Sequence, residues 1–300
     1  MKQNSDRLQA TLSKLGAREN APMSQYTSFR TGGNAKTLVE PDSPEALAEL
    51  IAALEACGED YIVIGNGTNL LVSDDGIENT VIRIGEKMGS VRAGGSRFFA
   101  QAGASFSALA KATVEAGFMG LEWAAGIPGS VGGAVAMNAG AYGGETADHL
   151  AEVSYYEKGR IVMEKAEPAS FGYRKSPYAY PERIVLCAQF ELLPDDGGAA
   201  GRMREYTAAR RAKQPLAYPS AGSTFKRPEG NFAGALIEQA GLKGKRIGGA
   251  EVSTLHAGFL INAGGATSMD VYALIRYVQQ AVYTHSGVML EPEVKLVGSF

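Results

Sequence analysis

The stretch from Ala124 to Gly144 constrains this chain most, because it holds almost no side chain large enough to pack a core. Its letters read A-A-G-I-P-G-S-V-G-G-A-V-A-M-N-A-G-A-Y-G-G. Ordering so many small residues costs backbone entropy that side-chain burial cannot offset. Such a run makes sense where a large planar or phosphate-bearing ligand fills the space. We therefore expect a ligand-binding loop over these residues.

A second glycine-rich loop directly follows an apolar strand. The strand is Tyr61-Ile62-Val63-Ile64, and the loop reads Gly65-Asn66-Gly67-Thr68-Asn69. Glycines let backbone N–H groups converge on an anion, and the Thr and Asn side chains add donors. Alone, this segment would suit an ordinary strand-to-turn connection, and it matches neither the Walker nor the Rossmann fingerprint. Together the two loops predict a nucleotide cofactor.

The rest of the chain mixes short strand and helix signals, which is typical of an α+β protein. The clearest helix begins after Ser43, has Pro44 in its first turn and ends at Gly58. Asp195 to Gly201 is rich in Asp, Gly and Ala, which indicates a linker. The other expected elements are strands at 61–64, 81–84, 99–102, 151–156, 160–164, 184–192 and 293–297, helices at 105–117, 203–213, 232–240 and from 267 or 268, and a polar helix or tail over 1–20.

Charge and composition exclude several classes of protein. The net charge of -3 gives no basic field for nucleic acid or a membrane surface. No run approaches the roughly 20 apolar residues of a membrane span, and the N-terminus has no apolar signal core. Cys57 and Cys187, the only cysteines, are expected to be buried thiols, and we expect no metal site. The expected location is the cytoplasm.

The two loops carry a family resemblance. V-I-G-N-G-T-N-L-L, followed by A-G-I-P-G-S-V-G-G-A-V-A-M-N-A-G-A-Y-G, resembles the PCMH-type FAD-binding domain of vanillyl-alcohol-oxidase flavoproteins. More narrowly, the chain resembles the UDP-N-acetylenolpyruvoylglucosamine reductase (MurB) family from about Asn20 to Gly298. The resemblance implies an α+β fold with a two-lobed FAD-binding domain at 20–195 (lobes about 20–84 and 85–195, with strand 294–300 returning to the first lobe) and a substrate-binding domain at 202–293.

The same resemblance implies a cofactor and its binding residues. FAD is expected to bind non-covalently, since the first loop lacks the His or Cys through which many related oxidases attach flavin. The first loop would bind the FAD pyrophosphate, and the second would run along the pyrophosphate and the flavin ring. The implied FAD-binding residues are Gly65, Asn66, Gly67, Thr68, Asn69, Leu70, Ile127, Pro128, Gly129, Ser130, Gly133, Ala134, Asn138 and Gly140.

Three further motifs carry the implied chemistry. Reducing an enolpyruvyl ether requires a hydride at the terminal carbon, a proton at the adjacent carbon and a cation beside the developing charge. The resemblance assigns the cation to Arg174 in F-G-Y-R-K-S, the proton donor to Ser223 in A-G-S-T-F-K-R-P and a polarising carboxylate to Glu293 in L-E-P-E-V. Taken singly, the three could equally be a surface turn, a common serine turn and an edge charge.

Substrate and NADPH phosphates require cations and polar contacts. The resemblance implies these roles for Tyr173, Lys213, Lys226, Lys243 and His256. Surface lysines are usually only solvated, and His256 could equally be structural. The sequence departs from the family at Arg227, where Asn is usual, and this leaves one substrate contact open.

Spacing and motif content indicate the subtype and leave two alternatives. Only 49 residues separate Arg174 from Ser223, and the chain ends seven residues after Glu293, so the chain resembles the compact subtype that lacks a tyrosine-bearing lid. The implied partners are NADPH and a UDP-sugar, with no obligate protein partner. A non-covalent flavin oxidase of the same fold remains an alternative, as does an inactive flavin- or nucleotide-binding module.

Overall fold

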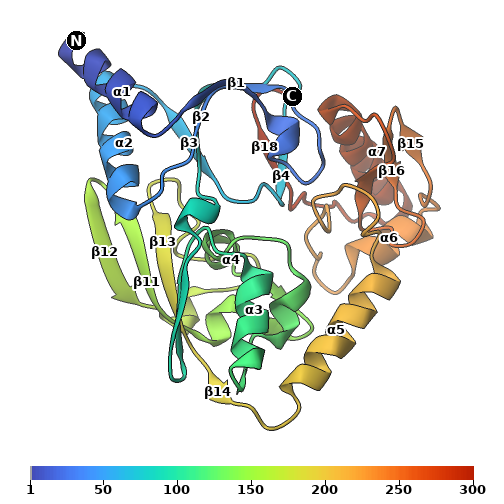
Figure 1. The fold of residues 1–300 in the computed structure, drawn as a ribbon. Helices are drawn as coiled ribbons and strands as arrows, with labels where there is room; N and C mark the ends of the chain where they lie inside the picture. The colour runs from blue at the N-terminus through green and yellow to red at the C-terminus, as the bar shows by residue number, and fades with distance from the viewer. Residues whose placement is uncertain (1) are drawn as a thin grey trace. The chain divides into compact units, whose positions relative to one another are not determined.

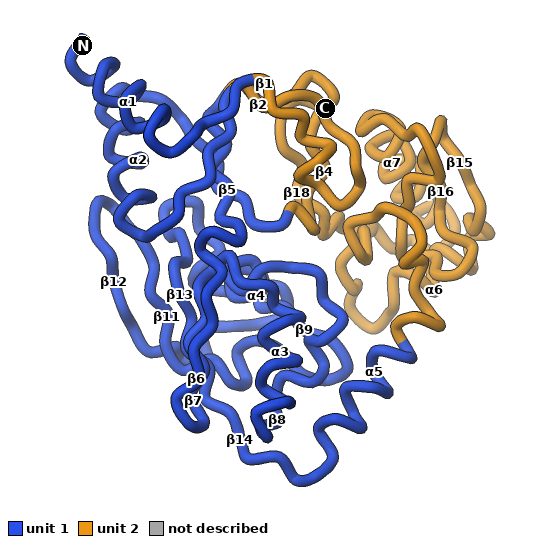
Figure 2. Tube along the Cα trace, in the orientation of Figure 1, with its two compact units in different colours: residues 1–19, 37–66, 79–209 blue, residues 20–36, 67–78, 210–300 orange. Residues whose placement is uncertain are grey.

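The computed structural model describes residues 2–300, which divide into two compact units (Figure 2). Unit 1 comprises residues 1–19, 37–66 and 79–209, and unit 2 comprises residues 20–36, 67–78 and 210–300. Each unit collects segments that are distant in sequence, and each has its own hydrophobic core. The chain passes between the units after Asn66, inside the first glycine-rich loop. The continuous domain limits expected from the sequence remain a prediction.

The N-terminal part of unit 1 contains a helix pair and the segments 18–19, 37–39, 61–64 and 79–83 of a small sheet. Helix α1 (Lys2–Lys14) packs on α2 (Pro44–Cys57). The Ser43 side chain caps α2 by accepting from the Ala46 N–H at 3.2 Å, and Gly58 ends the helix in the left-handed conformation, as predicted. The sheet has the order β1-β2-β5-β3, in which β3 and β5 run parallel. The bounds are β1 Arg18–Pro22, β2 Asn34–Val39, β3 Tyr61–Ile64 and β5 Ile77–Arg83.

The larger sheet of unit 1 has five antiparallel strands in the order β12-β11-β13-β7-β6 (Figure 1). Helix α4 packs against β13, and its buried side chains join those of the sheet in one core. The bounds are β6 Val91–Gly94, β7 Arg97–Gln101, α3 Phe106–Glu115, β8 Phe118–Met119, β11 Leu150–Glu157, β12 Arg160–Lys165, β13 Ile184–Glu191 and β14 Leu193–Pro194. The strands expected in this region are confirmed.

The glycine-rich stretch 124–144 is more regular than expected. It contains the end of a 3-10 helix (Glu122–Gly126), helix α4 (Val131–Met137) and most of a hairpin of β9 (Gly140–Ala141) and β10 (Gly144–Glu145). The expectation of one long loop was therefore wrong. The reason is the cap at Ser130, whose side chain accepts from the Gly133 N–H at 3.3 Å and starts a helix despite its two glycines.

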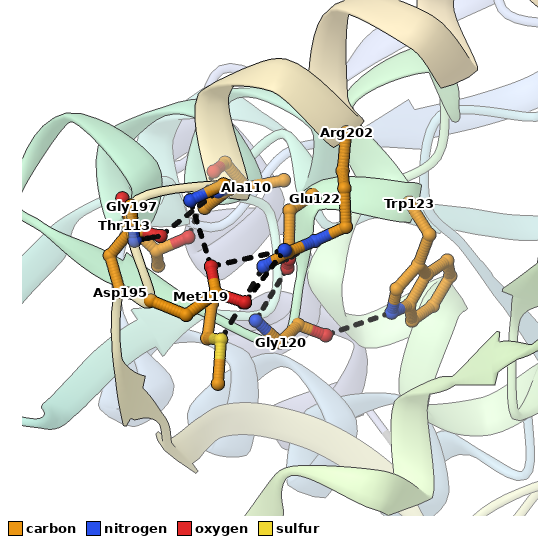
Figure 3. Close-up of polar contacts among 12 residues, drawn as sticks. Ala110, Thr113, Met119, Gly120, Glu122, Trp123, Asp195, Gly197 and Arg202 are labelled. Atoms are coloured by element: carbon orange, nitrogen blue, oxygen red, sulfur yellow. Dashed lines mark hydrogen bonds and ion pairs between the residues drawn. The ribbon is translucent and has the colours of Figure 1, made fainter.

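The segment expected to be a linker, 195–201, is ordered in unit 1. Its last residues form the first turn of α5 (Ala199–Lys213), and Oδ1 of Asp195 accepts from the N–H that starts this helix at 2.9 Å. Figure 3 shows Arg202 of the same helix reaching Glu122, with Nε 2.9 Å from Oε1. The small residues of this segment thus form a cap and a helix start, and composition alone did not distinguish these from a flexible connection.

Unit 2 packs one long helix on a small antiparallel sheet. Helix α7 (Ser268–Ser286) covers the sheet β15-β16-β17, and α6 (Ala233–Gln239) packs beside α7. The strands are β15 Arg246–Ile247, β16 Ala250–Val252 and β17 Leu260–Asn262. The terminal strand β18 (Lys295–Val297) pairs in parallel with β4 (Leu70–Val72), which follows the first glycine-rich loop. In the described part of the chain no helix is long and apolar enough to cross a bilayer.

Candidate active site

The two glycine-rich loops meet within unit 1. A side chain at Gly65 would place its Cβ 2.4 Å from the Ser130 hydroxyl oxygen, so a larger residue would displace the hydroxyl that caps α4. Next to it, Asn66 Nδ2 lies 3.4 Å from the carbonyl oxygen of Pro128. The start of the first loop and the residues before α4 are therefore neighbours, as two loops serving one ligand should be.

The remainder of the first loop belongs to unit 2 and is enclosed by a segment the sequence analysis overlooked. Gly67 has φ +62°, and a Cβ there would lie 1.9 Å from the Tyr26 carbonyl oxygen. The Ser28 N–H donates to the Gly67 carbonyl at 3.1 Å. Residues 26–33 therefore shape this loop. The signal in the sequence was Gly32-Gly33, where a Cβ on Gly33 would lie 2.2 Å from the Asp74 carbonyl oxygen.

Helix α5 contacts the second loop at both ends. Arg202 pairs with the buried carboxylate of Glu122, the first residue of the 3-10 helix that leads into the loop. One turn later, Tyr206 stacks on Tyr142 with ring centroids 4.7 Å apart and planes at 11°. Tyr142 lies in the β9–β10 hairpin with φ +54°. The helix thus fixes the stretch in which the expected FAD contacts lie.

The small residues of the second loop serve two different purposes. Gly132 is required by the protein, because a Cβ there would lie 2.9 Å from that of Ala102. Gly133 is exposed, and a Cβ there would approach only the Ser130 hydroxyl, at 3.3 Å. Glycine within a helix costs about 1 kcal/mol relative to alanine, and the Ser130 hydroxyl is the single nearby group that a Cβ at Gly133 would approach. Ala134, also an expected FAD contact, is buried in the core.

Arg174 lies at the tip of a two-residue turn in unit 1. The N–H groups of Gly172 and Lys175 each donate to the other's carbonyl, at 3.0 and 2.9 Å. Arg174 adopts φ +54°, which side-chain-bearing residues rarely do. Its guanidinium carbon lies 5.5 Å from the centroid of the Tyr173 ring. The turn therefore presents a permanent cation with an aromatic ring beside it.

Ser223 and Glu293 lie on neighbouring pieces of backbone in unit 2. The Glu293 N–H donates to the carbonyl of Thr224 at 2.8 Å, which places Ser223 one residue from this contact. The Thr224 N–H donates to Gly258 at 2.9 Å. Asn69 of the first loop donates its Nδ2 hydrogen to the Glu293 carbonyl at 3.0 Å. The unit thus gathers a hydroxyl, a carboxylate and the end of a glycine-rich loop.

Two of the predicted phosphate-binding lysines of unit 2 form ion pairs with glutamates. Lys226 forms an ion pair with Glu291, while Lys243 pairs with Glu238 at 2.6 Å. Burial lowers the pKa of the His256 imidazole, and the positive charge of Lys243 lowers it further.

The neutral form of His256 has a structural partner. Its Nδ1 accepts from the Gly258 N–H at 3.1 Å, and its ring packs edge-on against Phe259. Arg227, the departure from the family pattern, stacks its guanidinium over the exposed ring of Phe232 at 4.8 Å.

Unit 2 also contains a cavity of about 350 Å³, which no motif in the sequence indicated. Residues 214–218, which directly follow Lys213, form part of its wall. Its surface is mainly apolar, with two arginines and several hydroxyl-bearing residues among the residues that line it. The polar side chains include Arg211, Tyr218, Arg246, Glu251, Ser253 and Thr254.

Known proteins match both the N-terminal and the C-terminal part of the sequence. The family model for the UDP-N-acetylenolpyruvoylglucosamine reductase C-terminal domain matches residues 214–297, and an FAD binding domain model matches residues 35–162. The UDP-N-acetylenolpyruvoylglucosamine reductase of Agathobacter rectalis is 46% identical over 303 residues, with 96% of each chain covered. This chain belongs to that family. The enzyme of Lactobacillus delbrueckii subsp. bulgaricus is 45% identical over 286 residues, covering 95% of this chain and 96% of its own.

A solved structure of the family agrees. The crystal structure of UDP-N-acetylenolpyruvylglucosamine reductase (MurB) from Thermus caldophilus is 35% identical, with a TM-score of 0.81, and the match covers 94% of this chain and 98% of that one. The expected family and α+β fold class are therefore confirmed. Both glycine-rich loops lie inside the FAD-binding match, whereas Ser223 and Glu293 lie inside the C-terminal match. Arg174 lies in neither.

Proposed function

We propose that this chain reduces UDP-N-acetyl-3-O-(1-carboxyvinyl)-glucosamine to UDP-N-acetylmuramate with NADPH and FAD, a step of peptidoglycan synthesis. The observation that carries the proposal is that Ser223 and Glu293 lie on hydrogen-bonded neighbouring backbone segments in unit 2, in a chain whose family is named for this reduction. The reaction needs a proton donor, and the Thr224–Glu293 backbone hydrogen bond holds the segment that carries Ser223 beside the segment that carries Glu293.

FAD fits the loops of unit 1. The exposed Gly133 leaves its backbone open near Ser130, and the side-chain amide of Asn66 is a suitable donor for a phosphate. FAD held there would supply the hydride-transfer chemistry between NADPH and the substrate. The Gly-rich surface contributes close approach and N–H donors, and the stacked Tyr142–Tyr206 pair keeps the end of the loop in place.

Arg174, Ser223 and Glu293 then have separate tasks. The Arg174 guanidinium stabilises the negative charge that develops beside the substrate carboxylate. The Ser223 hydroxyl donates a proton to the carbon next to that carboxylate. Glu293 acts with Arg174 to polarise the carboxylate.

The nucleotide part of the ligands calls for cations in unit 2. Lys213, Lys226 and Lys243 are proposed to bind phosphates, with Tyr173 and His256 as further substrate contacts. The two lysines now paired with Glu291 and Glu238 can exchange these surface partners for phosphate oxygens, because exposed ion pairs are worth about 1 kcal/mol or less. We propose the cytoplasm as the location and no obligate protein partner.

The function is tested by measuring two half-reactions, each monitored through the absorbance spectrum of the flavin. Without oxygen, NADPH should bleach the yellow protein, and the enolpyruvyl UDP-sugar should restore the colour while gaining two hydrogen atoms by mass spectrometry. Restoration by oxygen but not by the sugar would favour an oxidase of the same fold. No bleaching at all would favour an inactive flavin-binding module.

A further inference from the structure

Asn138 is a buried polar residue at the end of α4. Its residue surface is 2% exposed, and its backbone is left-handed with φ +41° and ψ +59°. Asn and Asp are the side-chain-bearing residues that adopt this conformation most readily. The residue therefore ends the helix that follows the second glycine-rich loop.

Both polar atoms of the Asn138 side-chain amide form hydrogen bonds with the protein backbone. Its Nδ2 donates to the carbonyl of Gly172 at 3.0 Å, and its Oδ1 accepts from the N–H of Ala147 at 3.1 Å. A buried donor and acceptor satisfied in this way contribute to stability, and each is costly to leave unpaired. The amide is thus engaged by the protein itself, although the resemblance had placed Asn138 among the FAD contacts.

The carbonyl that Asn138 holds belongs to the Arg174 turn. Gly172 accepts there from both Asn138 and the Lys175 N–H, at 3.0 and 2.9 Å. The two residues between Gly172 and Lys175 are Tyr173 and Arg174, so the arginine is carried on a turn whose base Asn138 fixes. Asn138 and Gly172 are 34 positions apart in the sequence.

We propose that Asn138 is a positioning residue for Arg174, which ties the arginine turn to the helix that follows the flavin-binding loop. The proposal rests on the proposed function, because it gives Arg174 the substrate carboxylate as its target. Arg174 has an uncommon backbone conformation, so the turn needs support from outside. Without the tie, the guanidinium should lose its position while the FAD site keeps its own contacts.

The test is Asn138→Asp in the flavin-loaded enzyme. Aspartate has the same shape, tolerates the left-handed backbone and keeps an acceptor for Ala147, but its carboxylate repels the Gly172 carbonyl. Reoxidation of reduced flavin by the enolpyruvyl substrate should slow by at least about tenfold, since a displacement of about 1 Å can cost up to ~10²-fold. Bleaching by NADPH and the dissociation constant of FAD should change by less than about twofold, because neither depends on Arg174.

Thr146→Val is the matched control. The Thr146 hydroxyl donates to the carbonyl of Ala139 at 2.9 Å, next to Asn138, and is fully buried. Removing it weakens the same helix end but leaves the Gly172 hydrogen bond intact. Both half-reactions should therefore stay within about twofold once folded protein is counted.

Hydrogen exchange provides a readout apart from catalysis. The amides of Gly172 and Lys175 should exchange several-fold faster in Asn138→Asp but not in Thr146→Val, because only the first variant releases the turn. If Asn138→Asp does not fold, Asn138→Gly keeps the backbone conformation and should show the same pattern.

Failure of the positioning role of Asn138 can be distinguished from failure of the proposed function of Arg174. Unchanged exchange at Gly172 and Lys175, or equal slowing of both half-reactions, would overturn the positioning role. Arg174→Ala tests the function beneath it: if that variant reoxidises normally with substrate, the proposed task of Arg174 is wrong, whatever Asn138 does.

Discussion

The arginine turn of unit 1 and the Ser223–Glu293 ladder of unit 2 hold their side chains in opposite ways. Arg174 sits at the tip of a turn in a left-handed conformation, and Asn138, 34 positions from Gly172, hydrogen-bonds to Gly172 at the base of this turn. Ser223 and Glu293 lie on backbone that is hydrogen-bonded to neighbouring backbone, and neither has a positive φ. The turn therefore has a strained backbone, whereas the ladder is unstrained and depends on complete hydrogen bonding.

The ladder should be the more costly region to disrupt. The Thr224 hydroxyl is fully buried and accepts from the Leu260 N–H at 3.1 Å. Thr224→Val keeps the shape but leaves this N–H without a partner, which should lower the free energy of unfolding by about 2 kcal/mol. Thr224→Ser keeps the hydroxyl and is the control. Urea unfolding measures both, and equal stability of the Val and wild-type proteins would show that the ladder is not held in this way.

A substitution at the tip of the arginine turn should change the free energy of unfolding in the opposite direction. Arg174→Gly removes the steric cost of the left-handed backbone conformation. The variant should therefore raise the free energy of unfolding by up to about 1 kcal/mol, while substrate-driven reoxidation is lost. Lys175→Gly in the same turn is the control, because Lys175 does not have a positive φ and glycine should destabilise there. A stability loss in Arg174→Gly as large as in Lys175→Gly would refute the backbone strain at Arg174.

The smallest expected effect is a pH dependence confined to the ladder. Burial lowers the pKa of His256 below its ordinary 6.5, and its neutral Nδ1 supports Gly258, which accepts from Thr224. As pH falls below 6.5, the unfolded chain takes up a proton that the folded chain resists, so stability decreases until the lowered folded pKa is passed.

His256→Asn can keep an acceptor that does not titrate, so it should flatten this decrease. Urea unfolding of the two proteins at pH 7.5 and 5.5 measures the difference. The amides that hold the arginine turn do not titrate, so its hydrogen exchange, corrected for the intrinsic pH effect, should stay constant. An equal pH dependence in wild type and His256→Asn would contradict this role.

Local signals in the sequence predicted much of the fold. Ser43, Pro44 and Gly58 placed α2 because caps act within one turn of the residues they join. Helix α4 was missed because its glycines resemble loop residues and only the Ser130 cap marks its start. The glycines were attributed to a ligand, but Gly67 and Gly132 are required by the protein's own backbone and side chains.

The site was predictable as motifs but not as an arrangement. Arg174, Ser223 and Glu293 stand in short recognisable stretches, and so do both loops. The Asn138–Gly172 hydrogen bond and the contacts of α5 with the second loop join distant residues. A side chain bonded to a distant carbonyl leaves no period or spacing in the sequence, so only the structure reveals it.

The most direct test of the account is the timing of Ser223, measured by stopped-flow absorbance of the flavin in Ser223→Ala. Hydride transfer from NADPH needs no proton on carbon, so bleaching should stay nearly intact. Reoxidation by the enolpyruvyl substrate should slow by at least the ~10²-fold typical of losing a general acid, and Ser223→Cys should recover part of the loss. Equal slowing of both half-reactions in Ser223→Ala would contradict the account, because the serine would then be positioning flavin or ligands and not donating the proton.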